Sequence, residues 1–235
     1  MTMNERAIWL YGSHARNDYD CYSDIDIFVA GGPDIDEILN QLEFDRSQVS
    51  VSQYEWREVE SMARYGSLFL QHLRLEGRPL LVSLEGDRRL EHLLHTLCPY
   101  RHADRDIQAF TTCIDDVGKG LEKGSTPAFE MSVIATVLRH SAVLASYLIG
   151  RPKFGRLEPF QFVAKQWGFP DTVILEFKRV YQFRLHEDGR ASLPFEPSER
   201  DVRFWVTQAS KFLTLLKEEA SAYQKRVFTI DQSCS

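Results

Sequence analysis

Two short segments near the start of the chain decide its fold, Tyr11-Gly12-Ser13-His14-Ala15-Arg16 and, a little further on, Asp24-Ile25-Asp26-Ile27-Phe28-Val29. The second segment alternates between two kinds of side chain, a pattern typical of a β-strand. Successive side chains of a strand face opposite sides, so Asp24, Asp26 and Phe28 are expected on one face. The branched apolar residues between them are expected on the other face, where they pack into a core.

Asp24 and Asp26 are two residues apart along the predicted strand, which separates their backbones by about 7 Å. Without a cation between them the two carboxylates would repel each other. Magnesium prefers such hard oxygen ligands, and proteins usually hold it with one or two carboxylates together with substrate phosphates. The pair therefore predicts a magnesium site that a bound nucleotide completes.

The residues before this strand predict the phosphate end of such a site. Residues 7–11 read as a short buried strand, and Gly12 and Ser13 form the turn into a short helix. Glycine allows the backbone to approach a phosphate closely, and the Ser13 hydroxyl can donate a hydrogen bond to it. Arg16 adds a fixed positive charge within the same helix.

The whole motif, Gly-Ser followed after ten residues by Asp-x-Asp on a strand, resembles the signature of DNA polymerase β-type nucleotidyltransferases. Within that superfamily it is most similar to the minimal nucleotidyltransferases and the aminoglycoside nucleotidyltransferases. The resemblance extends over about residues 5–85. It implies an enzyme that moves a nucleoside monophosphate from a nucleoside triphosphate, with ATP the expected donor, to a hydroxyl group, releasing pyrophosphate.

Carried over by position, the resemblance makes Asp24 and Asp26 the catalytic magnesium ligands and Gly12 with Ser13 the cradle for the triphosphate. Arg16 is expected either to contact the phosphates or to brace the turn. The acceptor is unidentified, and a small molecule or a protein is favoured over RNA. The oligomeric state is left open, with a homodimer as one option.

The sequence departs from the family pattern at a third acidic residue, which many relatives carry on a neighbouring strand. Here that strand reads as residues 48–52, and the positions facing the site are Ser50 and Ser52, which are not carboxylates. One reading is a general base from elsewhere in the chain, with three candidates: Asp45, Glu55 and His72. A second reading relies on metal ions alone. A third is a nucleotide-binding regulator, antitoxin-like or sensor-like, with weakened catalysis.

Composition narrows the class of protein. A chain of 235 residues can form one large domain or two ordinary ones, and a hydrophobic fraction of 43% is enough to build their cores. A net charge of −6 argues against broad affinity for nucleic acid. No apolar leader is evident, and no uninterrupted apolar run approaches the roughly 18 residues of a membrane span. We expect a cytoplasmic protein without a membrane partner. Its cysteines are scattered and form no zinc motif, at positions Cys21, Cys98, Cys113 and Cys234.

The predicted fold class is α+β, with a nucleotidyltransferase domain over residues 1–86 and a helical bundle over residues 87–235. In the first domain a helix is expected to begin at Pro33, and a second over residues 54–75 is expected to break near Gly66. The sheet is expected to be mixed. Helical periodicity dominates the remainder of the chain, in the predicted helices 107–117, 127–148, 160–167, 173–183 and 201–223. The first of these is expected to end at Gly118 and Gly120.

Such helical partners follow the catalytic domain in aminoglycoside nucleotidyltransferases, and the related HEPN type accompanies minimal nucleotidyltransferases. Arg179 and His186 show the Arg-x6-His spacing of HEPN ribonucleases. Arg88 and His95 repeat that spacing, which shows how readily it arises in helical sequence. Solvated charges at a helix end are therefore favoured over a nuclease for Arg179 and His186.

Overall fold

The chain folds into two compact units, Met1–Arg101 and His102–Ser235, each considered separately below. The structure is a computed structural model and describes residues 5–31, 46–81 and 84–233, with the backbone alone for residues 46, 81, 84 and 227–233. The helix predicted from Pro33 and the candidate base Asp45 lie outside the described residues.

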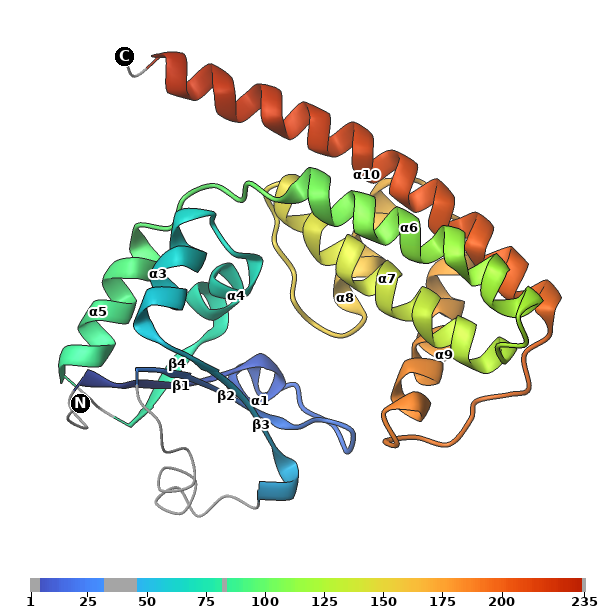
Figure 1. The fold of residues 1–235 in the computed structure, drawn as a ribbon, viewed down its shortest axis with the longest axis horizontal. Coiled ribbons are helices and arrows are strands. Elements are labelled where there is room, and N and C mark those ends of the chain that lie inside the picture. The colour runs from blue at the N-terminus through green and yellow to red at the C-terminus, as the bar shows by residue number, and fades with distance from the viewer. Residues whose placement is uncertain (1–4, 32–45, 82–83, 234–235) are drawn as a thin grey trace. The chain divides into compact units, whose positions relative to one another are not determined.

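A mixed sheet of four described strands forms the centre of the first unit (Figure 1). In spatial order its strands are β3 (Val49–Tyr54), β2 (Ile25–Ala30), β1 (Ala7–Tyr11) and β4 (Arg78–Leu81). β1 runs antiparallel to both β2 and β4, whereas β2 and β3 are parallel. A mixed sheet with helices, followed by a mostly helical region, confirms the predicted α+β class.

The two faces of the sheet pack into different cores. Trp9 and Phe28 lie in the larger core, and Ile27 and Val29 in a smaller one, as the strand alternation predicts. Phe28 is fully buried, while Asp26, two residues earlier on the same face, is half-buried. The larger core therefore begins next to the acidic end of β2.

Helices cover the larger core, as the buried residues of α3 (Trp56–Arg64), α4 (Leu68–Glu76) and α5 (Leu84–His95) show. The predicted break near Gly66 falls between α3 and α4, where Gly66 has a φ of +72°. Such a left-handed backbone favours glycine and ends the preceding helix.

The domain boundary predicted at residue 86 is wrong, because it falls inside α5. This helix belongs to the first unit: the indole Nε1 of Trp9 on β1 donates a hydrogen bond of 2.9 Å to Asp87, and Leu90 is fully buried in the larger core. A charged and glycine-containing segment looks like a linker in sequence, but here Gly86 permits close packing. A Cβ on Gly86 would collide with the backbone of Arg6.

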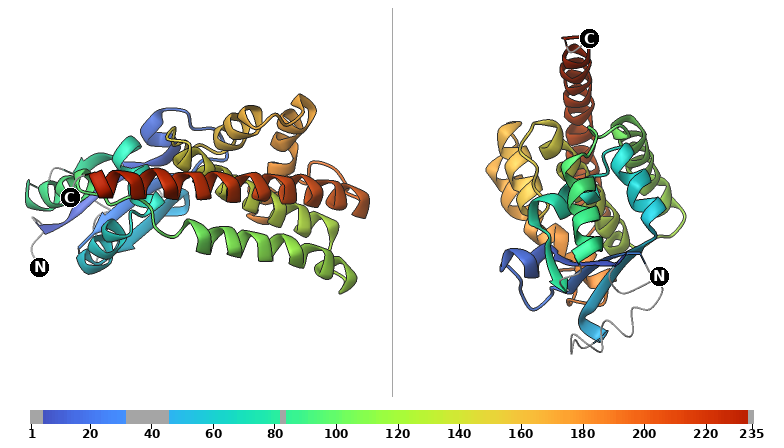
Figure 2. Two further views of the ribbon diagram at one scale, coloured as in Figure 1. Left: turned by 90° about the horizontal axis from the view of Figure 1, so that it is seen from above. Right: turned by 90° about the vertical axis from the view of Figure 1, so that its left-hand side faces the viewer.

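The second unit is helical throughout its described regular structure. Its helices are α6 (Ala103–Glu122), α7 (Pro127–Leu148), α8 (Glu158–Gln166), α9 (Asp171–Glu187) and α10 (Glu199–Ser233). α7 contacts each of the others and forms the centre of the unit. Figures 1 and 2 show α6, α7 and the first part of α10 side by side.

The helix predicted over residues 107–117 corresponds to α6. Its predicted end at Gly118 and Gly120 is wrong, since α6 continues to Glu122. A Cβ on Gly120 would lie 3.0 Å from the carboxyl carbon of Glu130 on α7, and closer still to its oxygen. Gly120 therefore allows two helices to approach each other and does not end a helix. α7 is long and apolar enough to cross a membrane, but most of it is buried within this unit, as in the core helix of a globular domain.

Candidate active site

The turn after β1 brings Gly12 directly against Asp26. β1 and β2 place Tyr11 opposite Asp26 in the antiparallel register, and Gly12 follows with a φ of +72°. A Cβ at Gly12 would lie 3.3 Å from the carboxyl carbon of Asp26 and would collide with the nearer oxygen. Glycine is thus required twice here, for its backbone conformation and for the space it leaves beside a carboxylate.

The neighbouring strand presents serines to the same face of the sheet. Ser50 lies beside Asp26 in the parallel register, on strands about 4.8 Å apart. The hydroxyl of Ser52 forms a 2.9 Å hydrogen bond with that of Tyr11. Since Val49 and Val51 pack into the smaller core on the opposite face, both serines face the Asp26 side as predicted. The expected position of a third acid is therefore occupied by hydroxyl groups.

The Tyr11 hydroxyl is not suited to act as a general base in this setting. Burial raises the pKa of the Tyr11 hydroxyl to about 12, and the nearby charge of Asp26 acts in the same direction, while the Ser52 hydrogen bond opposes them. The phenol stays protonated near neutral pH. Its role is therefore to hold Ser52 and the end of β1 in place.

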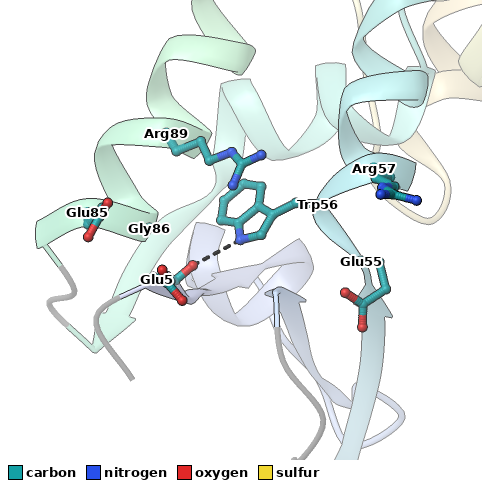
Figure 3. A pocket seen from close by; sticks show the side chains of 7 residues that line it. All are labelled: Glu5, Glu55, Trp56, Arg57, Glu85, Gly86 and Arg89. Carbon is teal, nitrogen blue, oxygen red and sulfur yellow. Dashed lines mark hydrogen bonds between the residues drawn. The ribbon is translucent and has the colours of Figure 1, made fainter. Parts of the chain in front are cut away.

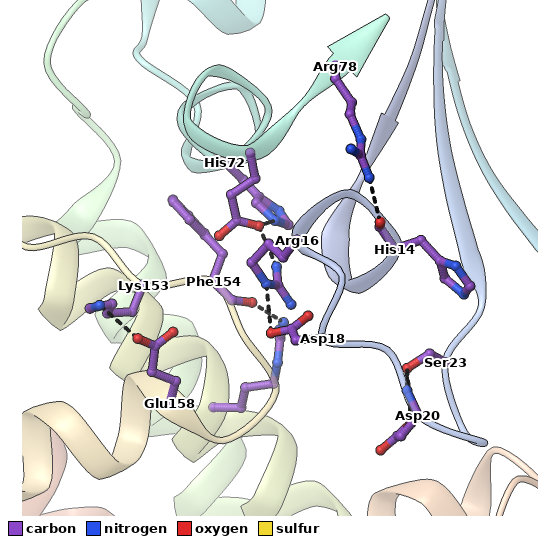
Figure 4. A network of polar contacts seen from close by, with 12 residues as sticks. His14, Arg16, Asp18, Asp20, Ser23, His72, Arg78, Lys153, Phe154 and Glu158 are labelled. Carbon is purple, nitrogen blue, oxygen red and sulfur yellow. Dashed lines mark hydrogen bonds and ion pairs between the residues drawn. The ribbon is translucent and has the colours of Figure 1, made fainter. Parts of the chain in front are cut away.

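A chain of ion pairs fixes the short helix α1 (Gly12–Arg16) to α4 (Figure 4). The guanidinium of Arg16 donates to Asp18 at 3.0 Å and also pairs with Glu76. Glu76 in turn lies 2.6 Å from Nε2 of His72, one helical turn earlier on α4. These contacts are those expected if Arg16 braces the turn.

Glu76 is the partly buried centre of this network. Burial alone would raise its pKa, but the hydrogen bonds from His72 and Arg16 outweigh that effect and lower it. The hydrogen bonds of Arg16 to Asp18 and Glu76 raise the pKa of its guanidinium against the opposing effect of burial. Sequence reasoning missed Glu76, which lies one residue beyond the helix predicted over residues 54–75, although its position four residues after His72 was a usable signal.

The segment that includes α1 and the loop leading to Asp24 is held by hydrogen bonds at several points. Arg78 on β4 donates to the backbone carbonyl of His14 at 2.8 Å, and the Ser23 hydroxyl donates to the carboxylate of Asp20 at 2.9 Å (Figure 4). Asp24 follows this turn and immediately precedes β2. It is half-buried, as Asp26 is.

Of the candidate bases, His72 lies on the Asp26 side and Glu55 does not. The ring of His72 packs edge-on against that of Tyr11, with centroids 5.5 Å apart. Glu55 follows Tyr54, which pairs with Ala30, so it lies about 13 Å along the sheet from Asp26. Its carboxylate instead completes a capping box with Glu58 at the start of α3.

A pocket of 590 Å³ occupies this opposite end of the sheet (Figure 3). The guanidinium of Arg89 lies 4.4 Å above the ring of Trp56, whose Nε1 donates to the backbone carbonyl of Glu5. The remaining lining residues are Glu55, Arg57, Glu85 and Gly86. Apart from Glu55, one of the candidate bases, the predicted site residues are not among these lining residues.

The carboxylates of Asp24 and Asp26 are the type of ligand that magnesium prefers. Asp24 and Asp26 offer hard oxygen ligands beside a turn that only glycine can form. Within residues 5–31, 46–81 and 84–233, no three histidine, cysteine or acidic side chains gather into a metal-binding group. Two carboxylates without a complete protein cage are what Mg²⁺ accepts when phosphates and water supply the other ligands.

Arg179 and His186, the residues with the spacing of HEPN ribonucleases, make structural contacts. Arg179 pairs with Glu176 at 3.1 Å, and its guanidinium lies 4.8 Å from the ring centre of Phe195. Nδ1 of His186 lies 3.1 Å from the backbone carbonyl oxygen of Ala191. Both side chains hold the end of α9 and the segment after it, which favours the structural interpretation.

Comparison with known proteins agrees with this geometry. Residues 3–66 match the family model described as the nucleotidyltransferase domain. The matched segment includes the Gly12 turn, Asp24, Asp26 and the serine-bearing β3. This match bears out the resemblance of residues 3–66 to nucleotidyltransferases and supports nucleotidyl transfer in general. No curated protein matches the chain.

Proposed function

We propose that the protein is a magnesium-dependent nucleotidyltransferase that moves a nucleoside monophosphate from a nucleoside triphosphate, with ATP as the expected donor, to an acceptor hydroxyl. The observation that supports this most is the contact between the Gly12 turn and the carboxylate of Asp26 within a matched nucleotidyltransferase domain. This contact brings the turn proposed to bind phosphates next to a carboxylate proposed to bind the metal ion.

Each residue of the site has a distinct role in the proposed reaction. Gly12 and Ser13 bind the triphosphate, with the Ser13 hydroxyl as a donor. Arg16, tied to Glu76, keeps α1 in the orientation that this binding requires. Fixing the triphosphate in this way lowers the entropic cost of in-line attack.

Asp24 and Asp26 would hold magnesium, which supplies charge neutralisation at the phosphates when bound. His72, oriented by Glu76, is the base candidate that the contacts favour. We further propose a cytoplasmic location, and a small molecule or a protein as the source of the acceptor hydroxyl.

A nucleotide-binding regulator is the second candidate function. It is favoured by Ser50, which lies beside Asp26 where a third carboxylate is expected. Such a protein binds Mg²⁺ and nucleotide but releases little pyrophosphate. A general base contributes about 10²–10⁴ in rate, so its loss alone could reduce a transferase to a binding protein.

The two functions are separated by measuring pyrophosphate release from ATP, GTP, CTP and UTP with Mg²⁺, with and without cell extract as a source of acceptor. We compare the wild type with the double variant Asp24→Ala, Asp26→Ala. Release that depends on extract and is lost in the double variant supports the transferase. Metal-dependent nucleotide binding without release supports the regulator.

A further inference from the structure

His14 on α1 and Tyr19 in the loop that follows it form a stacked aromatic pair between the Gly12 turn and Asp24. Their ring centroids lie 4.3 Å apart, and the ring planes differ by only 4°. Tyr19 is 59% exposed although His14 covers one face of its ring. The pair thus presents a flat aromatic surface to solvent.

The loop holds this surface in place from both sides. Before Tyr19, Asp18 accepts a hydrogen bond of 3.0 Å from Arg16. After it, Asp20 and Ser23 close a turn through hydrogen bonds of 2.9 to 3.1 Å. A planar ligand would therefore meet an ordered surface, and binding would cost little additional conformational entropy.

We propose that the His14–Tyr19 pair binds the nucleobase of the nucleoside triphosphate by stacking. His14 directly follows Ser13, so the stacking surface and the proposed triphosphate turn are adjacent in the chain. This inference rests on the proposed function and extends it to the base. Every nucleobase has a π face, so stacking discriminates weakly between bases. The site therefore accepts purine and pyrimidine nucleotides alike.

The test compares a nucleotide with a ligand that has phosphates but no base. We measure by calorimetry the binding of two magnesium complexes, those of inorganic tripolyphosphate and of a methylene-bridged ATP analogue that cannot be transferred. Replacing Tyr19 with leucine should weaken the ATP analogue about tenfold, the value of one base–aromatic stack, with tripolyphosphate affinity unchanged. The magnesium complex of the corresponding methylene-bridged CTP analogue, measured in the same way, should lose affinity for Tyr19→Leu to a similar extent.

Two further variants identify the cause of any loss. Tyr19→Phe keeps the ring and should restore the affinity that leucine loses, which would assign the effect to stacking. Phe204→Leu removes an aromatic ring that is 48% exposed on α10, and it should leave both affinities at the wild-type value.

Several results would overturn the stacking role. Equal loss of both ligands in Tyr19→Leu would make Tyr19 a support of the phosphate turn, and an unchanged affinity for the ATP analogue would remove it from the site. Failure of Tyr19→Phe to restore binding would assign the effect to the hydroxyl. If the wild type binds neither ligand, the proposed function itself fails, which is distinguishable from all of these.

Discussion

The two ends of the sheet in the first unit both gather charged side chains, but they do so for different reasons. At one end Asp26 lies against a turn that needs glycine, beside serines of the next strand. At the other, a 590 Å³ pocket surrounds the contact between Arg89 and Trp56. Of the charged side chains of the pocket, Glu55 caps a helix and Arg89 covers an indole ring. These contacts are structural, whereas the proposed site lies where a carboxylate contacts the main chain.

The largest expected effect belongs to the acidic end of the sheet. Asp24→Asn and Asp26→Asn each neutralise a carboxylate proposed to bind the metal ion, so transfer should fall by about 10³-fold or more, with the melting temperature little changed. Pyrophosphate release at saturating Mg²⁺ measures this. Asp115→Asn, an exposed carboxylate on α6, serves as the matched control. Turnover near the wild-type rate in either site variant would disprove the proposed mechanism.

Gly12→Ala tests the close contact itself. The new Cβ would push Asp26 away from its position, and a shift of about 1 Å in a catalytic group can cost about a hundredfold in rate. Gly168→Ala is a precise control for backbone strain, because Gly168 has a φ of +70° but its Cβ would meet nothing within 4 Å. Gly12→Ala should lose at least as much stability as Gly168→Ala, and far more activity. Similar activity in the two variants would mean that the contact has no functional importance.

Glu76→Gln should have an intermediate effect, mainly on stability. Ionised Glu76 is favoured in the folded state because its pKa lies below the ordinary 4.5, so its stabilisation is present above pH 4.5 and is lost as the pH falls through the lowered value. We expect a cost of about 2 kcal/mol at pH 7 that shrinks towards pH 3. Denaturant unfolding of both proteins across this range measures it, and a difference independent of pH would contradict the ionic role of Glu76.

The smallest effect on transfer is expected at the pocket end. Glu55→Gln keeps a hydrogen-bonding side chain at the start of α3 but removes a candidate base about 13 Å from Asp26. Activity should stay within about twofold, with at most about 1 kcal/mol of stability lost through the weakened cap. A large fall in pyrophosphate release, measured alongside the melting temperature, would place the general base at this end of the sheet after all.

Local patterns predicted the parts of this fold that depend on neighbours in sequence. Strand alternation correctly predicted the faces occupied by Ile27, Val29 and the serines of β3, because a period of two is a local property. The prediction that a helix ends at Gly120 was wrong because this glycine serves a tertiary contact, the close approach of Glu130 on the next helix, which local sequence does not reveal. The domain boundary predicted at residue 86 was wrong for the same reason, because Gly86 packs closely against the backbone of Arg6, far away in the sequence.

The site shows the same division between local and tertiary information. The spacing of Gly12, Ser13, Asp24 and Asp26 is visible in the sequence, and their roles in binding and catalysis remain predictions. The link from Arg16 through Glu76 to His72 joins residues about 60 positions apart and depends on how α4 packs against α1. Nothing in the local pattern specifies that packing.

The closeness of Asp26 to fully buried Phe28 has a consequence for the motion of the site. A carboxylate two residues from the middle of a core strand shares the low amplitude of that core, because backbone hydrogen bonds to both neighbouring strands restrain it. Slow exchange of backbone amide hydrogens is therefore expected along β2 as far as Asp26. On heating, the geometry of Asp26 should persist until the sheet melts, so that catalytic competence and the cooperative unfolding of the first unit disappear in one transition.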